Sequence, residues 1–185
     1  MDPQEEWERA EKELEEKGEL QQSSLWRYLR LGLSIILVIL ILTYILVDPN
    51  VRDVITGFFE SSTVVDSVFE YGDKTIVFDG TTYSQLVGLW QDNQEAEFRA
   101  CLGGTVNKNK YVVDKILLPD IHSANVYRVI SGPCPDNTII DLHSHPFQRC
   151  IASQVDLNGL EIKKKTSPDL LLAVMCTEER ISFYG

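Results

Sequence analysis

The stretch Asp141-Leu-His-Ser-His-Pro-Phe-Gln-Arg-Cys-Ile-Ala-Ser-Gln-Val-Asp156 holds two of the three histidines in this 185-residue chain, one residue apart. His143 and His145 each offer a neutral imidazole nitrogen, and Asp156 offers a hard carboxylate oxygen. Three such ligands leave one position of a tetrahedral zinc ion open, as in catalytic sites, whereas a structural zinc usually has four protein ligands that often include thiolates. We therefore expect one catalytic Zn²⁺ per chain, held by these three residues.

The same stretch predicts a local structure that brings the ligands together. Residues 138–143 have the pattern of a strand, and side chains at positions i and i+2 of a strand point to the same face. Pro146 lacks a backbone donor and is expected to end this strand. His143 and His145 can therefore face one metal ion from the end of the strand.

A loop over residues 147–152 then lets the chain turn back toward the strand end. Ser153 is a favourable helix cap, and Asp156 falls in the first turn of a helix expected over residues 152–165. A carboxylate in that turn also suits the helix dipole. We expect a three-point metal cage built by one strand end and by the helix that follows it.

Outward from this stretch, residues 67–185 show alternating strand and helix patterns. A helix is expected over residues 82–94, capped by Thr82 or Ser84. The sum is a mixed α/β domain of about 120 residues, which is an ordinary size for an independent core. In it, helices flank a mixed sheet whose further strands are expected at residues 68–71, 75–78, 97–106, 110–119, 125–130, 170–176 and 181–184.

Residues 31–47 (LGLSIILVILILTYILV) contain no charged side chain. As a helix they rise about 25 Å, and apolar and aromatic flanks extend this to the roughly 30 Å of a hydrocarbon core. A buried core helix that is apolar on every side would need a much larger domain to cover it. A cleaved signal peptide would begin with a short basic segment rather than an acidic one. We expect an uncleaved, single-pass transmembrane anchor over residues 25–47.

The segments on either side of this anchor differ in charge. Residues 1–24 carry nine acidic and three basic side chains, a net charge of −6 out of −11 for the whole chain. This acidic tail is expected to be a solvated helix or disordered. Residues 48–66 are expected to be a juxtamembrane connector with a short amphipathic turn. Nucleic acid is not an expected partner, because phosphate binding requires a cationic surface and Lys163-Lys164-Lys165 fits a solvated helix end.

Basic residues around the anchor predict its orientation. Four of them stand in the twenty residues before the uncharged run, and one, Arg52, stands in the twenty after it. The positive-inside rule then places the N-terminus in the cytoplasm and the C-terminal domain outside.

The four cysteines do not identify the compartment. Cys101 and Cys176 lie in apolar, strand-like runs and are expected to be small core residues. Cys134 and Cys150 lie in loop-like surroundings and can pair with each other if the domain faces an oxidising space. None of the four has the CxxC spacing of a thiolate metal site.

The metal-binding stretch resembles the motif of the JAMM (MPN+) zinc metallopeptidases, which include the deubiquitinase of the proteasome lid and many archaeal and bacterial members. The family pattern is His-x-His-Pro, six residues, then Ser-x-x-Asp, and it stands here without a gap from His143 to Asp156. Upstream, Glu97-Phe-Arg-Ala-Cys-Leu-Gly-Gly104 resembles the family's Glu-x-x-Gly-x-x-x-Gly segment, with Ala100 at the first glycine. Glu95 is a rival for the glutamate, but the spacing to Gly104 favours Glu97.

The resemblance covers about residues 67–185 and implies an MPN fold, which is similar in overall shape to the cytidine deaminases. It implies that a zinc-bound water, with a pKa lowered toward about 7, attacks the substrate. Glu97 would be the general base, and Ser153 would donate a hydrogen bond to the oxyanion. Without the resemblance, Glu97 would be a surface carboxylate at a strand start and Ser153 only a helix cap. His122 is expected to be an exposed loop residue rather than a ligand.

The implied function is hydrolysis of an isopeptide or peptide bond, with a ubiquitin-like modifier conjugate or a short peptide as substrate. One alternative is a non-catalytic MPN scaffold at the membrane, although such relatives usually lose metal ligands. Another is a JAMM hydrolase of small conjugates, which pocket size would distinguish. A zinc deaminase is excluded, because the chain lacks the paired His-x-Glu and Cys-x-x-Cys motifs. Ubiquitin-like substrates are cytosolic, whereas the basic residues place the domain outside, so the side of the membrane stays open.

Overall fold

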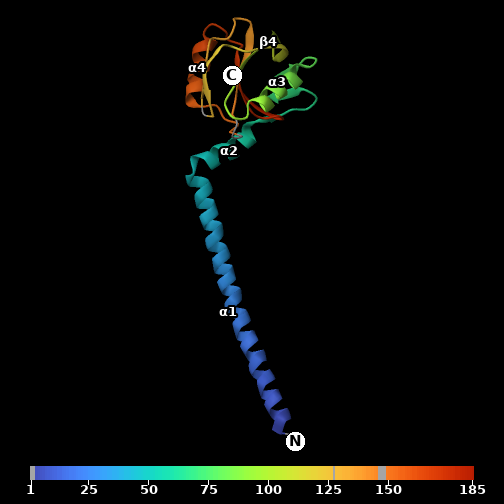
Figure 1. Ribbon diagram of the computed structural model, residues 1–185, viewed down its shortest axis with the longest axis vertical. Helices are drawn as coiled ribbons and strands as arrows, with labels where there is room; N and C mark the ends of the chain where they lie inside the picture. The colour runs from blue at the N-terminus through green and yellow to red at the C-terminus, as the bar shows by residue number, and fades with distance from the viewer. Residues whose placement is uncertain (1–2, 127, 146–148) are drawn as a thin grey trace. The chain divides into compact units, whose positions relative to one another are not determined.

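The computed structural model describes the backbone of residues 3–126, 128–145 and 149–185, and the side chains in these ranges except at residues 3, 15–24 and 50. It has two compact units, Met1–Asp48 and Pro49–Gly185. The first contains one helix, and the second contains a large mixed sheet with helices (Figure 1). The prediction of a mixed α/β domain preceded by one long apolar helix is confirmed at this level.

The first unit is the helix α1 (Pro3–Val47), which runs without a break through the acidic tail and the apolar stretch. Its segment Leu25–Val47 has 23 residues and is long and apolar enough to cross a membrane. At 1.5 Å per residue such a segment rises about 34 Å, compared with about 30 Å for a hydrocarbon core. In the most apolar 18-residue stretch of this segment, 0% of the residues are buried by the rest of the described chain.

The second unit is built on an eight-stranded sheet with the strand order β1-β10-β9-β8-β4-β5-β3-β2. The pairs β8–β9 and β3–β5 are parallel, and the other neighbours are antiparallel. The strands are Ser62–Thr63 (β1), Val68–Tyr71 (β2), Lys74–Phe78 (β3), Arg99–Asn107 (β4), Lys110–Leu117 (β5), Thr138–Ser144 (β8), Leu171–Thr177 (β9) and Arg180–Tyr184 (β10). A separate hairpin is formed by β6 (Ile121–Asn125) and β7 (Arg128–Ser131). The helices of this unit are α2 (Pro49–Glu60), α3 (Thr82–Asp92) and α4 (Gln154–Lys164).

Helices α3 and α4 cover opposite faces of the sheet. Leu171 belongs to the main core together with Leu86 of α3, whereas its neighbour Leu172 packs with Leu160 of α4. Consecutive strand residues point to opposite faces, so this alternation separates the two layers. Strands β8 and β9 lie inside the sheet and are buried along almost their whole length, which explains their continuous apolar runs.

The register of β4 shifts between Gly103 and Gly104 against β5, and between Leu102 and Gly103 against β8. A Cβ atom at position 104 would overlap the carbonyl oxygen of Val112. Glycine is therefore required there for the close approach of β4 and β5. Gly104 is the position that anchors the upstream part of the family resemblance.

Some local predictions were wrong. Residues 125–130 do not form one strand; the chain instead makes the β6–β7 hairpin, whose residue 127 lies outside the described residues. Helix α3 is capped by neither Thr82 nor Ser84: its N-cap is Thr81, without a side-chain capping bond. The predicted end of β8 at Pro146 and the start of the following loop also lie outside the described residues.

The juxtamembrane segment has more structure than the expected short turn. Residues Pro49–Glu60 form α2, a helix of 12 residues. Proline suits the start of a helix, because its fixed φ is helical and its missing N–H group would have no intrahelical partner there. Gly57 lies within α2 where a Cβ atom would crowd the backbone of Cys150, so α2 approaches the domain closely at this point.

Two disulfides, Cys101–Cys134 and Cys150–Cys176, each join a strand cysteine to a loop cysteine. The pairing of Cys134 with Cys150, which the sequence left open, is not formed, and the two strand cysteines take part in disulfides as well as packing in the core. Strand β8 separates β4 from β9, so the two strand cysteines lie on either side of it and each meets a different loop. Both strand cysteines are fully buried, as expected.

Replacing both Cys101 and Cys134 by alanine is expected to lower the free energy of unfolding by about 2–4 kcal/mol, because the bridge restricts the unfolded chain. Urea unfolding followed by near-ultraviolet circular dichroism measures this change. Peptide mapping of the non-reduced wild-type protein should recover the 101–134 and 150–176 links. A peptide linking Cys134 to Cys150 would contradict the connectivity.

Candidate metal centre

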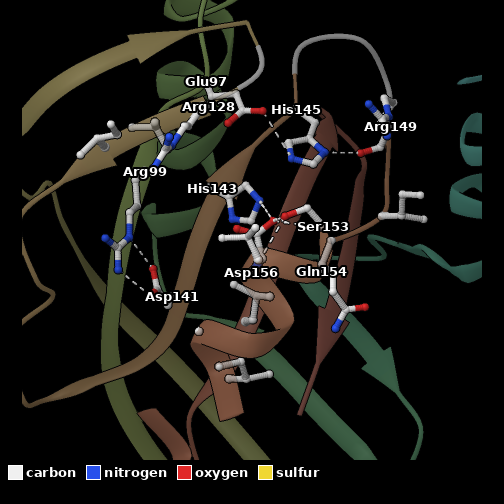
Figure 2. A pocket seen from close by; sticks show the side chains of 18 of the residues that line it. Glu97, Arg99, Arg128, Asp141, His143, His145, Arg149, Ser153, Gln154 and Asp156 are labelled. Carbon is white, nitrogen blue, oxygen red and sulfur yellow. Dashed lines mark hydrogen bonds and ion pairs between the residues drawn. The ribbon is translucent and has the colours of Figure 1, made fainter. Parts of the chain in front are cut away.

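The end of β8 and the start of α4 bring the three predicted ligands together. The ligand atoms of His143, His145 and Asp156 all lie within 4.8 Å of one another (Figure 2). His145 follows the last residue of β8 and stays beside β9, because its N–H group donates to the carbonyl of Met175 at 2.8 Å. The two imidazoles share a face, as the i and i+2 spacing predicts, and their ring centroids are 4.9 Å apart.

Both imidazoles keep an Nε2 atom that could bind a metal ion. His145 Nδ1 lies 2.7 Å from the carbonyl oxygen of Arg149, so Nδ1 carries the proton and Nε2 keeps a lone pair. His143 Nε2 is buried, has no hydrogen-bond partner among the described residues, and lies 3.5 Å from Asp156 Oδ2. A buried polar atom without a partner is costly. A cation held between these atoms would satisfy them, so the donor set fits a metal ion.

Burial keeps both histidines neutral near pH 7. It lowers the pKa of His143 to about 4, against the charge of Asp156, which acts in the opposite direction. Burial also lowers the pKa of His145, although the hydrogen bond to the Arg149 carbonyl opposes this. Because neutral imidazole is the form that binds metals, both ligands are available without first losing a proton.

Asp156 and Ser153 form a capping box at the start of α4. The Ser153 N–H and Oγ–H groups donate to Asp156 Oδ2 at 2.9 and 2.6 Å, and the Asp156 N–H group donates to Ser153 Oγ at 3.3 Å. The prediction of Ser153 as the helix cap is confirmed. The Asp156 oxygen held by these bonds is the one that faces His143, so the helix cap also orients the third metal ligand.

Glu97 reaches the same site from the segment just before β4. Arg99 pairs with His143 in the antiparallel β4–β8 ladder, so Glu97, two residues earlier, lies opposite His145, two residues later. The Glu97 Oε1 atom is 3.5 Å from His145 Nε2. Strand register thus places the predicted general base beside the metal ligands, although it is far from them in sequence.

Glu97 is only 7% exposed. Burial is the main cause that raises its pKa to about 7, and the charge of Asp156 adds to it. The charge of Arg149 and a hydrogen bond from the Val129 backbone act in the opposite direction. A carboxyl group that titrates near neutrality can accept and return a proton at physiological pH, which is the property of a general base.

Beside His143 lies a buried ionic cluster that the sequence analysis missed. Asp141 accepts hydrogen bonds from Arg99 Nε and Nη2, both at 2.7 Å, and from Lys163 Nζ at 2.5 Å. Burial opposes ionisation of Asp141, but these bonds and charges outweigh it and lower the pKa. Lys163 therefore does more than end a solvated helix. The sequence does show that Asp141 precedes His143 by two residues, a spacing that places both on one face of the strand. It does not show the cationic partners of Asp141, because Arg99 and Lys163 lie on other elements.

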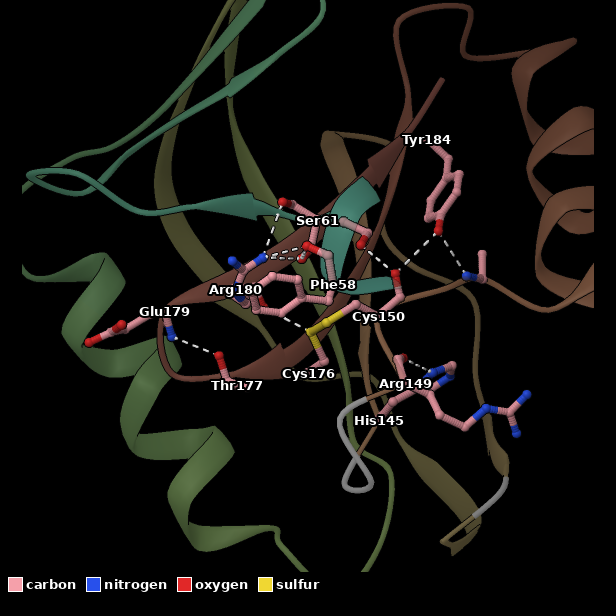
Figure 3. The surroundings of a disulfide bond; sticks show 12 residues. Phe58, Ser61, His145, Arg149, Cys150, Cys176, Thr177, Glu179, Arg180 and Tyr184 are labelled. Carbon is pink, nitrogen blue, oxygen red and sulfur yellow. Dashed lines mark hydrogen bonds between the residues drawn. A yellow bond between two sulfur atoms is a disulfide. The ribbon is translucent and has the colours of Figure 1, made fainter. Parts of the chain in front are cut away.

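The chain between His145 and α4 is held by contacts with β9 and β10. We call the described residues Arg149–Ala152 the return segment. Cys150 forms the disulfide with Cys176, and its carbonyl accepts a hydrogen bond from Ser182 Oγ (Figure 3). The Ala152 N–H group donates to Tyr184 Oη at 3.0 Å. These contacts fix the path that connects two metal ligands.

The ligands and Glu97 line a cavity of about 1450 Å³. Small-molecule sites usually measure roughly 300–1,000 Å³, so this cavity has room for a segment of chain. Its walls include residues from α2, the β6–β7 hairpin, the return segment and α4. Neither His122 nor Glu95 lines it, and both are exposed. His122 lies on β6 rather than in a loop.

A scan against protein-family models and a search of the curated proteins both find no match for this chain. Family and function therefore have to be argued from the geometry and chemistry of the site.

His143→Ala is expected to reduce bound zinc from about one ion per chain to a small fraction, because three ligands are the fewest that a catalytic zinc site uses. Metal analysis of the purified full-length protein after dialysis against zinc measures this. His122→Ala is the matched control, since His122 is an exposed histidine outside the cavity, and it should retain wild-type zinc. Equal zinc in the two variants would show that the site does not hold the metal.

Proposed function

We propose that this chain is a membrane-anchored zinc metallopeptidase of the JAMM type, with an MPN fold in the domain that carries the sheet. The observation that carries this proposal is the position of Glu97, whose carboxylate lies 3.5 Å from His145 Nε2 beside a three-ligand cluster. A base at the open side of three ligands suits hydrolysis, whereas a structural site would complete its shell with a fourth ligand. The motif spacing and the geometry support the same assignment.

Zinc held by His143, His145 and Asp156 would polarise the scissile carbonyl group and lower the pKa of the attacking water. Glu97 would be the general base that takes a proton from the attacking water and returns it to the leaving amine. Burial raises the pKa of this carboxyl group in the metal-free site, and the positive charge of a bound ion would favour the carboxylate form that accepts the proton. The Nδ1–H bond from His145 to the Arg149 carbonyl keeps the imidazole in the orientation that the site needs.

Ser153 is proposed to stabilise the oxyanion. Its side chain is exposed and lines the cavity, and its hydroxyl group donates to Asp156. When the Asp156 oxygen serves as a metal ligand, the hydroxyl group can turn toward a substrate carbonyl in the cavity. A hydrogen bond aimed at the developing negative charge lowers the barrier to acyl transfer.

The segment Leu25–Val47 is proposed to span the membrane once, with the domain outside the cytoplasm. The excess of basic residues before the span supports this orientation. The two disulfides support it independently, because cytosolic thiols are kept reduced and disulfides persist in oxidising compartments. Both observations favour the same side of the membrane.

This location restricts the substrate. A domain outside the cytoplasm does not meet cytosolic ubiquitin-like conjugates, so the proposed substrate is a peptide or isopeptide bond in an extracytoplasmic protein. The cavity of about 1450 Å³ supports a polypeptide over a small conjugate, which would leave much of this volume unfilled.

Glu97→Gln is expected to lower peptidase activity by at least about 10²-fold, the typical contribution of a general base, while zinc content stays unchanged. Mass spectrometry of a peptide mixture incubated with the full-length protein measures cleavage. Glu95→Gln is the control, because Glu95 is a nearby exposed glutamate. Cleavage by Glu97→Gln at the wild-type rate would refute the assigned role.

Glu97→Gln is also expected to have a higher free energy of unfolding than the wild type in the metal-free state at pH 8. The pKa of Glu97 is raised from 4.5 to about 7 on folding, so the folded state loses stability as the pH rises between these values. Removing the charge of Glu97 is expected to raise the free energy of unfolding by about 1–3 kcal/mol at pH 8. A simple structural role for Glu97 would predict destabilisation instead, and urea unfolding in a chelator distinguishes the two.

In intact cells or spheroplasts, an added protease is expected to digest the C-terminal domain, while an epitope tag at the N-terminus stays protected until the membrane is opened. Immunoblots against the tag and the domain report both ends of the chain. Protection of the domain before the membrane is opened would reverse the orientation and reopen cytosolic conjugates as substrates.

A further inference from the structure

Helix α2 has an apolar side that the folded domain leaves uncovered. Val54, Ile55, Phe58 and Phe59 are 37%, 38%, 56% and 81% exposed. At 3.6 residues per turn these four side chains fall within an arc of about 140°, which is the apolar stripe of an amphipathic helix. We call these four residues the α2 apolar face. A contiguous exposed face of this kind indicates a binding surface rather than scattered apolar residues.

The other side of α2 is attached to the return segment beside the metal ligands. Gly57 lies so close to Cys150 that any larger residue would force the two apart. Arg149 donates to Asp53 at 2.5 Å, and the Arg149 carbonyl is the partner of His145 Nδ1. Two of the α2 residues, Asp53 and Gly57, therefore bind the domain directly at the segment that connects two metal ligands.

A third attachment lies near the end of α2. Arg180 of β10 donates to the Phe58 carbonyl at 2.9 Å and to Ser61 Oγ at 2.7 Å. Its guanidinium group also stacks on the Phe58 ring, with 4.0 Å between the guanidinium carbon and the ring centroid (Figure 3). These contacts fix the rotation of α2: Val54 borders the metal cavity and Phe58 packs under Arg180 at the edges of the apolar face, and Phe59 is 81% exposed.

We propose that α2 lies in the headgroup region of the bilayer, with the α2 apolar face directed to the lipid. This proposal depends on the transmembrane span of the proposed function. Pro49 follows Val47 by two residues, so α2 begins within about 8 Å of the end of the span. A helix this close to the hydrocarbon boundary, with Phe58 and Phe59 exposed, has the amphipathic pattern of interfacial helices.

The bilayer is favoured over a protein partner by the continuity of the chain. The apolar segment that ends at Val47 already lies at the membrane, and Asp48 and Pro49 mark a polar helix end followed by a new helix start. A helix of 12 residues is about 18 Å long, so lying flat it can place all four apolar side chains at one depth. If α2 instead stood perpendicular to the bilayer, Phe59 near its far end would be in water.

The proposal has a consequence for the substrate, because α2 also forms a wall of the metal cavity. Arg52, Asp53 and Val54 line this cavity. A cavity that has one wall in the headgroup region is accessible to the parts of membrane proteins that lie nearest the bilayer. The substrate class is therefore an extracytoplasmic segment next to a transmembrane span, or a peptide bound to the membrane surface.

The experiment measures the depth of single spin labels in full-length protein in phosphatidylcholine nanodiscs. Four variants are used: Leu40→Cys in the span, Phe59→Cys and Ile55→Cys on the α2 apolar face, and Ile162→Cys on α4. Ile162 is the matched control, because it is an apolar helical side chain that is 66% exposed. The native cysteines are all in disulfides, so they do not take the label. Power saturation compares collisions with oxygen, which partitions into lipid, and with a water-soluble nickel chelate.

The oxygen-to-nickel accessibility ratio at residues 55 and 59 is expected to be several-fold higher than at residue 162 and lower than at residue 40. Nickel accessibility at residues 55 and 59 equal to that at residue 162 would overturn the proposal, because α2 would then be in water. Protection from both reagents would also overturn it, because a protein would cover the face. A low ratio at residue 40 would reject the membrane anchor itself. Zinc content and peptidase activity of the same samples test the proposed chemistry separately, since depth does not depend on either.

Discussion

Two imidazoles that share one polar centre, one buried and one partly buried, are the constraint on which the rest of this domain depends. His143 Nε2 is buried without a hydrogen-bond partner among the described residues, and His145 Nε2 faces the same point. Burial suppresses protonation of both rings, so repulsion between two imidazolium ions does not arise at neutral pH. A bound cation would offset the cost of desolvating these atoms. The domain therefore holds two imidazole lone pairs in place at a point where a metal ion could bind.

This arrangement draws on elements that are distant in the sequence. The ladder between β4 and β8 sets Glu97 opposite His145, and Ser144 secures it by exchanging hydrogen bonds with the Phe98 backbone at 2.9 Å. The capping box of α4 orients Asp156. The return segment has no regular secondary structure, and the Cys150–Cys176 disulfide joins it covalently to β9. Register, helix capping and a covalent bond thus each position a different part of the site.

The parts of the site that could be predicted from the sequence are those governed by local rules. Strand periodicity predicted that His143 and His145 share a face, and helix-capping preferences predicted the place of Ser153. The Asp141–Arg99–Lys163 cluster was not predicted, because its partners come from three elements whose packing no local pattern encodes. The disulfide connectivity could not be predicted for the same reason.

The juxtamembrane segment shows a further limit of local rules. Its apolar residues were recognised as an amphipathic turn, but the length of α2 and its contacts with the metal site were not. Those contacts depend on Gly57, which looks like a helix breaker in sequence and is needed in the fold for close approach to Cys150. A glycine that lowers helix propensity can therefore be the residue that allows a helix to pack.

The charges around the metal cavity bear on how a substrate is chosen. Asp53 is paired one to one with Arg149, and a pair of opposite charges has a weak field at a distance. Asp141 instead lies between two cations, Arg99 and Lys163, so this cluster carries one excess positive charge beside the cavity. For the proposed hydrolytic site, room for a chain segment does not by itself select among polypeptides, so another restriction on what is cleaved is needed. Confinement to one side of the membrane, and to the layer next to the bilayer, would provide that restriction by limiting which polypeptides can reach Glu97.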